Sequence, residues 1–212
     1  MRKGFLLIVF AWGLLFSLSA QRYQEVFFYN DVVSKNFFLG FGFKGNVYVN
    51  NNSANDVEVW KKPTLGINVF TGYWFSQIFG GRLLFEGGRI HPYFQNTTRM
   101  VEESYALGRL DLLIDMTSSI YGYSRDKIYS FIPYAGFSGA YVYNAENRPD
   151  NAVRSSSFFF GVGIMNSFRM SQNLSTYINF GFDFVDANFD GYKDNRKLNG
   201  IASASIGLVV DF

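Results

Sequence analysis

The regular alternation of apolar with small or polar residues constrains this chain more than any other feature of its sequence. In the last eleven residues, 202–212, every even position is Ala, Ile, Leu, Val or Phe, and the odd positions hold Ser, Gly, Val and Asp. Successive side chains of a β-strand point to opposite faces, so a period of two predicts a strand with one apolar face. The strand finishes on the aromatic Phe212, which is typical of a bacterial outer-membrane barrel whose last strand faces lipid.

Seven upstream segments share this alternation. One face of each is rich in Phe, Leu, Ile, Val and Tyr, and the other carries Gly, Ser, Asn and charged residues. A tilted strand of about 9–11 residues crosses a bilayer, and every segment reaches that length. The eight predicted strands are residues 37–49, 64–75, 80–90, 105–117, 130–143, 157–169, 174–186 and 202–212.

The connections between these segments fit one barrel. A single-chain bacterial barrel has an even number of strands, short periplasmic turns and longer extracellular loops. The long polar connections are residues 50–63, 91–104, 144–156 and 187–199, and the short ones are 76–79 and 170–173. Residues 118–129 form a turn that is long for the periplasmic side. The sequence therefore predicts an all-β fold, an eight-stranded antiparallel up-and-down transmembrane β-barrel, over residues 36–212.

Charge placement indicates which face of each strand points inward. A charged side chain on the lipid face costs about 2–4 kcal/mol for Arg or Lys at the bilayer midplane. Buried charges need partners, and the interior of eight strands holds only side chains. We therefore expect a plugged polar interior, with Asp211 on the same side of the last strand. The residues expected in this interior network are Lys44, Arg82, Glu86, Arg109, Asp111, Asp115, Arg169 and Asp183.

Aromatic residues are expected in girdles at the two membrane interfaces. The chain holds 25 Phe and 14 Tyr residues. Those near the predicted periplasmic ends are Tyr73, Trp74, Phe75, Phe79, Tyr129, Phe131 and Phe168, and those near the outer ends are Tyr48, Trp60, Tyr141, Tyr143 and Phe184.

The last strand also predicts how the barrel closes. It must pair with the first strand, 37–49, because an open edge would leave backbone groups unpaired in lipid. The apolar positions of the last strand are expected to act as an assembly signal for the barrel assembly machinery during biogenesis. These positions are Ile206, Leu208, Val210 and Phe212.

The N-terminus predicts export. A basic start at Arg2 and Lys3 precedes an apolar run over residues 4–18 and the small residues Ser19 and Ala20, the order found in secretory signal peptides. The run is shorter than the roughly 20 residues of a spanning helix. Residues 1–20 are therefore the expected signal peptide, and residues 21–35 an expected periplasmic N-terminal extension.

Composition excludes several classes of function. The chain has 19 basic and 17 acidic residues, and loss of Arg2 and Lys3 with the signal leaves the two signs balanced. That balance gives no reason to expect nucleic-acid binding. Without cysteine, the chain forms no disulfide and carries no lipid-modified cysteine.

Several motifs in the middle of the chain support a family resemblance. They are Gly108-Arg109-Leu110-Asp111, residues 115–119, Tyr121-Gly122-Tyr123 and the Pro133-Tyr134-Ala135-Gly136 strand. In this order, and with the terminal Phe212, they resemble the outer membrane protein A-like β-barrel family in its Bacteroidota form, over residues 36–212. Many members carry a C-terminal peptidoglycan-binding domain, and we expect this chain to lack it. The resemblance implies a location in the bacterial outer membrane.

Two loop features could carry chemistry. His91, the only histidine, could act as a base near Glu102 or Ser104, but an exposed loop histidine is the expected interpretation. Residues 186–191 match the first half of a calcium loop, yet the twelfth position is Lys197 instead of Glu. We therefore expect no catalytic residue, no metal and no cofactor.

The expected function is a structural or surface-interaction role. The alternatives are a loop-mediated adhesin, a subunit of an envelope complex, a lipid-acting or proteolytic enzyme based on His91, and a narrow pore. Expected partners are outer-membrane lipid and lipopolysaccharide, the assembly machinery and another envelope protein that binds the outer loops.

Overall fold

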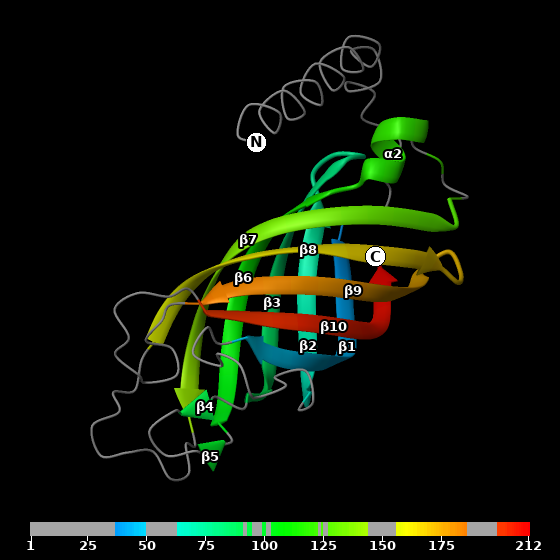
Figure 1. Cartoon of the computed structure of the whole chain (residues 1–212). Coiled ribbons are helices and arrows are strands. Elements are labelled where there is room, and N and C mark those ends of the chain that lie inside the picture. The colour runs from blue at the N-terminus through cyan, green and yellow to red at the C-terminus, as the bar shows by residue number, and fades with distance from the viewer. Residues whose placement is uncertain are drawn as a thin grey trace, which may run out of the picture. The chain divides into compact units, whose positions relative to one another are not determined.

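The computed structural model describes residues 37–49, 63–90, 93–94, 99–100, 103–122, 124, 127–143, 156–185 and 199–212. Within them, eight long strands form a closed antiparallel barrel in the order β1-β10-β9-β8-β7-β6-β3-β2 (Figure 1). The barrel strands are β1 (Phe37–Val49), β2 (Thr64–Trp74), β3 (Phe79–Ile90), β6 (Glu103–Ile114), β7 (Tyr129–Tyr143), β8 (Ser156–Arg169), β9 (Leu174–Val185) and β10 (Asn199–Asp211). The predicted fold class is confirmed.

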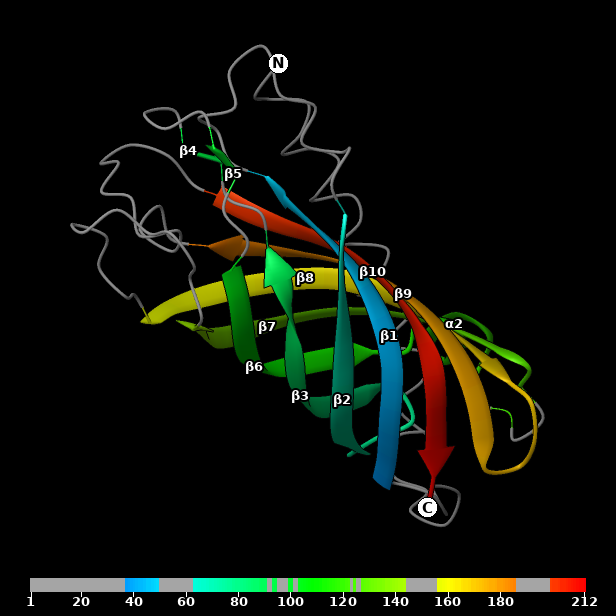
Figure 2. The same ribbon diagram turned by 90° about the horizontal axis from the view of Figure 1, so that it is seen from below.

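The first and last strands close the barrel. β1 pairs with β10 from Phe38↔Asp211 to Val49↔Gly200, and Figure 2 shows the two strands side by side. Beyond the last pair, the Phe212 amide donates to the Phe37 carbonyl at 2.9 Å, and their ring centroids lie 5.8 Å apart. The seam therefore leaves no open edge between these strands, as the sequence predicts.

Side chains alternate between the wall and the interior with the predicted parity. On β1, Phe41 and Phe43 are 46% and 63% exposed, whereas Phe38 and Lys44 are 2% and 3% exposed. The apolar positions of β10 follow the same rule, since Ile206 and Leu208 are exposed and Val210 is half-buried, and Phe212, directly after the strand, is exposed as well. A continuous apolar wall of this kind is stable only in apolar surroundings.

Aromatic residues gather near both ends of the wall, with exceptions. Tyr73, Phe75 and Tyr129 are exposed near one end, and Tyr141 and Phe184 near the other. Tyr48 and Trp74 depart from the prediction because their even positions place them with the inward residues of β1 and β2. Tyr48 is 5% exposed, and Trp74 packs against a buried core cluster. Trp60 lies outside the described residues, as does the side chain of Tyr143.

The fourth predicted strand, 105–117, is wrong at its C-terminal end. β6 stops at Ile114, and a short helix, α2 (Met116–Tyr121), follows it and connects β6 to β7 (Figure 1). Asp115 starts the helix because its side chain accepts a hydrogen bond from the Ser118 amide at 3.0 Å, which satisfies a free helix donor. The helix ends at Gly122, whose φ of 81° suits glycine. It accounts for the unusually long predicted turn.

A second addition is a small hairpin between β3 and β6. It consists of β4 (Tyr93–Phe94) and β5 (Arg99–Met100), joined by pairing of Tyr93 with Met100 and of Phe94 with Arg99.

The signal peptide and the periplasmic extension predicted for residues 1–35 lie outside the described residues. No helix in the described part of the chain has the length and hydropathy needed to cross a membrane.

The closing strand generates a prediction about assembly. Leu208 is 48% exposed and pairs with Phe41 at the seam. Replacing it with Arg should reduce the amount of folded barrel, because an Arg facing lipid costs about 2–4 kcal/mol at midplane depth. The folded fraction is measured by the different migration of unboiled and boiled protein in detergent gels. Leu208→Ile is the matched control and should fold normally; wild-type levels of folded L208R would contradict a lipid-facing position.

Candidate functional site

The interior of the barrel is layered. We call the end of the barrel at Val49, Ile90, Tyr143 and Val185 the loop side and the opposite end the turn side. An apolar loop-side layer contains Tyr48, Ile90, Tyr105, Leu107, Ala140, Val142, Val185 and Ile201. An apolar turn-side layer contains Phe38, Phe70, Leu84, Leu113, Ile132, Tyr134, Met165, Tyr177 and Val209. Six of the eight charges predicted for the interior network lie in strand positions between the ends of the barrel, at 0–6% exposure.

Four of these charges form a continuous chain of ion pairs. Two nitrogens of Arg82, Nε and Nη2, donate to Asp111 Oδ2 at 2.9 and 2.6 Å. The other carboxylate oxygen of Asp111 lies 2.7 Å from Arg109 Nε. Arg109 Nη1 in turn donates to Asp183 Oδ1 at 2.6 Å. Because β6 and β9 are not neighbours in the barrel, the last pair connects strands that share no backbone hydrogen bonds.

The two remaining charges form a separate pair. Lys44 Nζ on β1 donates to the Glu86 carboxylate on β3, and both side chains are almost completely buried. β2 lies between these two strands in the wall. A buried pair of this kind offsets the cost of removing two charges from water only if both partners remain.

Aromatic rings support the guanidinium groups. The Arg82 guanidinium carbon lies 4.3 Å from the centroid of the Tyr134 ring, and that of Arg109 lies 5.1 Å from it. Arg82 also lies 5.2 Å from the Phe70 ring centroid. A cation over an aromatic face is attracted by the ring quadrupole, so one tyrosine helps to hold both arginines in place.

Inward glycines provide space for this network. A Cβ at Gly161 would lie 2.3 Å from Asp183 Oδ1 and 2.8 Å from Arg109 Nη1, and a Cβ at Gly136 would lie 2.3 Å from Asp111 Oδ1. Any larger residue at these positions would displace the ion pairs. Glycine is therefore required here by close approach.

The other two predicted network residues lie at the turn side. Asp115 follows β6, caps α2 and pairs with Lys127, whose Nζ also donates to Ser118 Oγ at 2.7 Å. Arg169 is the last residue of β8 and is half-buried. Because β6 ends at Ile114, Asp115 lies outside the strand and caps α2 instead of joining the interior network. Sequence reasoning missed Lys127 because it lies in the predicted turn 118–129, outside the strand faces to which the interior network was assigned.

Uncharged polar residues complete the buried interior. The Tyr177 hydroxyl donates to Asn68 Oδ1 at 2.6 Å, and Asn179 Nδ2 lies 3.4 Å from Ser205 Oγ. Each lies on the inward parity of its strand, so the alternation could have identified them. The predicted network contains only charged residues, so these polar partners are an addition to it.

The proposed loop chemistry lies outside the described residues. This holds for His91, for the calcium-like segment 186–191 and for Lys197. Among the residues that the structure describes, no group of three or more His, Asp or Glu side chains could hold a metal ion.

An apolar, aromatic-rimmed wall around a charged interior defines an outer-membrane β-barrel protein. No protein-family model matches the chain. The chain is 29% identical, over 156 residues, to Outer membrane protein 40 of Porphyromonas gingivalis (strain ATCC BAA-308 / W83). The match covers 70% of this chain and 37% of that protein, so the chain spans just over a third of the length of this curated relative.

Solved structures share the fold. The crystal structure of Neisserial surface protein A matches with a TM-score of 0.55 and 9% identity, covering 83% of this chain and 97% of that one. A major outer membrane protein from Thermus thermophilus matches with a TM-score of 0.53 and 12% identity, covering 83% and 99%. These similarities agree with the predicted resemblance to outer membrane protein A-like β-barrels, and the location of the chain is the bacterial outer membrane.

The Lys44–Glu86 ion pair generates a prediction about stability. Lys44→Met should leave Glu86 buried without its partner and destabilise the barrel by about 3–5 kcal/mol, and Glu86→Gln should do the same to Lys44. The double variant K44M/E86Q should lose much less unfolding free energy than the two single variants lose together, because it leaves neither charge without a partner. Urea unfolding in lipid vesicles measures the three free energies. Additive losses would show that the pair contributes no coupling.

Proposed function

We propose that this protein is a closed structural barrel that holds its loop-side connections at the cell surface, where they interact with another envelope component. The observation that carries this proposal is the filled interior. Two apolar layers and the ion pairs between them occupy the inside of the wall. An eight-stranded barrel has room only for side chains, so the described interior favours support over transport.

The charge pairing favours a structural role over catalysis. The carboxylates of Glu86, Asp111 and Asp183 each contact a cation. A general base must be within reach of a substrate proton, whereas these groups are enclosed and neutralised by their partners. Their chemistry supports a stabilising function.

The different lengths of the connections favour interaction on one side. On the turn side, residues 75–78 join β2 to β3 and residues 170–173 join β8 to β9. On the loop side, residues 50–63 join β1 to β2 and residues 186–198 join β9 to β10. Longer connections are typically extracellular. Proposed partners are outer-membrane lipid and lipopolysaccharide around the wall, the assembly machinery at β10 and an envelope protein at the loop side.

The filled interior predicts the absence of conductance. Purified, refolded protein in planar bilayers should give no discrete current steps, with a reconstituted general porin as the positive control. The variant R109A/D183A should also remain closed, because the apolar layers on both sides of that ion pair are unchanged. Regular single-channel steps from the wild-type protein would contradict the proposal and favour a narrow pore.

The surface role predicts loop-dependent binding. Replacing the four loop-side connections with short turns should leave the barrel folded, as judged by gel migration, and should abolish co-purification of any envelope component found with the wild type. Restoring one connection at a time should identify the segment that binds. Unchanged co-purification by the loop-less barrel would assign binding to the wall or the turn side.

A further inference from the structure

The lipid-facing wall contains a groove. It has a volume of about 560 Å³ and extends over β2, β3, β6 and β7. Its floor consists of small residues, Gly87, Ala106, Gly108 and Gly139. Phe85 and Tyr141, which are 56% and 46% exposed, stand at its sides.

The register places these small residues together. Gly87 pairs with Ala106, which pairs with Tyr141. In the adjoining row, Phe85 pairs with Gly108, which pairs with Gly139. Outward residues of one strand repeat every second position, so the two rows are neighbours on the same outer face. With the pairing of β2 and β3, which places Ile67 opposite Gly87 and Val69 opposite Phe85, the groove depends on three strand pairings that no local sequence pattern encodes.

The fold does not require glycine on this floor. A Cβ at Gly139 would meet nothing within 4 Å, one at Gly108 would lie 3.7 Å from the Phe85 ring, and one at Gly87 would lie 4.0 Å from a carbonyl. Among the described glycines, only Gly122 has a positive φ. Glycine within a strand costs stability because it lacks a side chain to pack and loses more backbone entropy. The inward glycines make space for ion pairs, whereas these three make space outside the barrel.

The size of the groove favours a slender occupant. Its volume is within the range of about 300–1,000 Å³ for small-ligand sites. Eleven residues line it, whereas a stable protein interface uses about 20–30 residues on each side. In the membrane the wall is surrounded by hydrocarbon, so an acyl chain is the apolar group of matching shape.

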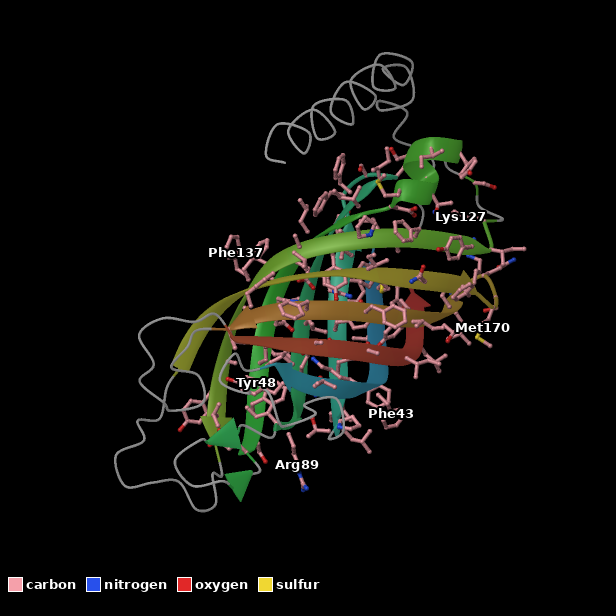
Figure 3. All side chains as sticks on the ribbon, viewed as in Figure 1. Phe43, Tyr48, Arg89, Lys127, Phe137 and Met170 are labelled. Atoms are coloured by element: carbon pink, nitrogen blue, oxygen red, sulfur yellow. The ribbon has the colours of Figure 1, made fainter. Side chains whose placement is uncertain are left out.

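A cation lies on the same face beyond the loop-side end of the groove. Arg89 is two residues after Gly87 on β3, shares its outward parity and is exposed. Two residues of strand advance about 7 Å, and Figure 3 shows the Arg89 side chain extending away from the barrel. Long arginine side chains reach the head-group level from within the hydrocarbon. A guanidinium there is complementary to a lipid phosphate.

We propose that this groove is a lipid-binding site that holds one acyl chain of an outer-leaflet lipid, with the phosphate of its head group at Arg89. The chain occupies the space above Gly108 and Gly139, against Phe85 and Tyr141. The site binds the lipid without covalent chemistry. It would give the barrel a bound lipid at a fixed position beside β3 and β6.

Spin-labelled lipid tests the site directly. The full-length mature protein is refolded into phosphatidylcholine vesicles that contain phosphatidylglycerol spin-labelled near the end of its acyl chain. Electron paramagnetic resonance then measures the motionally restricted lipid fraction. We expect G108L/G139L to lose most of the restricted fraction that is specific to the wild type. Gly45→Leu is the matched control, because Gly45 is an outward β1 glycine whose Cβ would also have space, 3.9 Å from the nearest atom. It should leave the fraction unchanged.

Separate variants test the head-group contact and the wall of the groove. Arg89→Gln should abolish the preference for spin-labelled phosphatidylglycerol over spin-labelled phosphatidylcholine and should leave chain immobilisation intact. Tyr141→Ala should weaken immobilisation for both lipids, and it provides the test if G108L/G139L fails to fold. Gel migration establishes folding in each case.

Three results would overturn the proposal. The first is an equal restricted fraction in wild type, the filled variant and Y141A. The second is an unchanged head-group preference in R89Q. The third is a dimer, seen by cross-linking in vesicles, that dissociates when the groove is filled while the restricted fraction stays the same. That third outcome would assign the groove to a second copy of this chain.

Discussion

Backbone hydrogen bonding in hydrocarbon is the constraint on which the rest of this structure depends. An unpaired N–H or C=O group costs several kcal/mol where no water can satisfy it, so the sheet must close on itself. The pairing of β1 with β10 achieves this closure. Closure also determines the interior, because eight strands enclose a space that only side chains can fill. Charges directed inward must then find partners within that space.

The interior solves this problem by connecting strands that are not neighbours in the wall. Arg109 on β6 contacts Asp183 on β9, and Lys44 on β1 contacts Glu86 on β3. These ion pairs connect strands across the interior, in addition to the backbone hydrogen bonds that connect neighbouring strands around the wall. The apolar layers at either side exclude water from the charges, which strengthens their attraction and raises the cost of losing one partner. The same arrangement supports a closed barrel.

Glycine has two opposite uses in this barrel. At Gly136 and Gly161 a side chain would collide with the ion pairs, so packing dictates the residue. At Gly108 and Gly139 the wall would accept a side chain, and the absence of one shapes the outer surface. The outer glycines therefore point to something beside the barrel, and the proposed lipid is the occupant that fits their surroundings.

Much of this fold could be predicted from local periodicity. Alternation is a property of consecutive residues, so the strands, their inward faces and the β1–β10 seam followed directly from the sequence. The same parity assigned Arg82, Glu86 and Arg109 to the interior. The alternation failed at Asp115, where a side chain that caps a helix ended the strand early. The hydrogen bond from the Ser118 amide to the Asp115 side chain starts a helix, although the apolar–polar alternation continues to residue 117.

The tertiary structure decided which of these residues meet. Asp183 is far from Arg109 in the sequence, and only the register and curvature of the closed sheet bring their side chains to 2.6 Å. The groove likewise combines four strands, so no single segment could reveal it. The sequence by itself determined which face each side chain occupies, because that depends on neighbours along the chain. Partners inside the barrel and the shape of its outer wall depend on strand pairing, which only the folded barrel specifies.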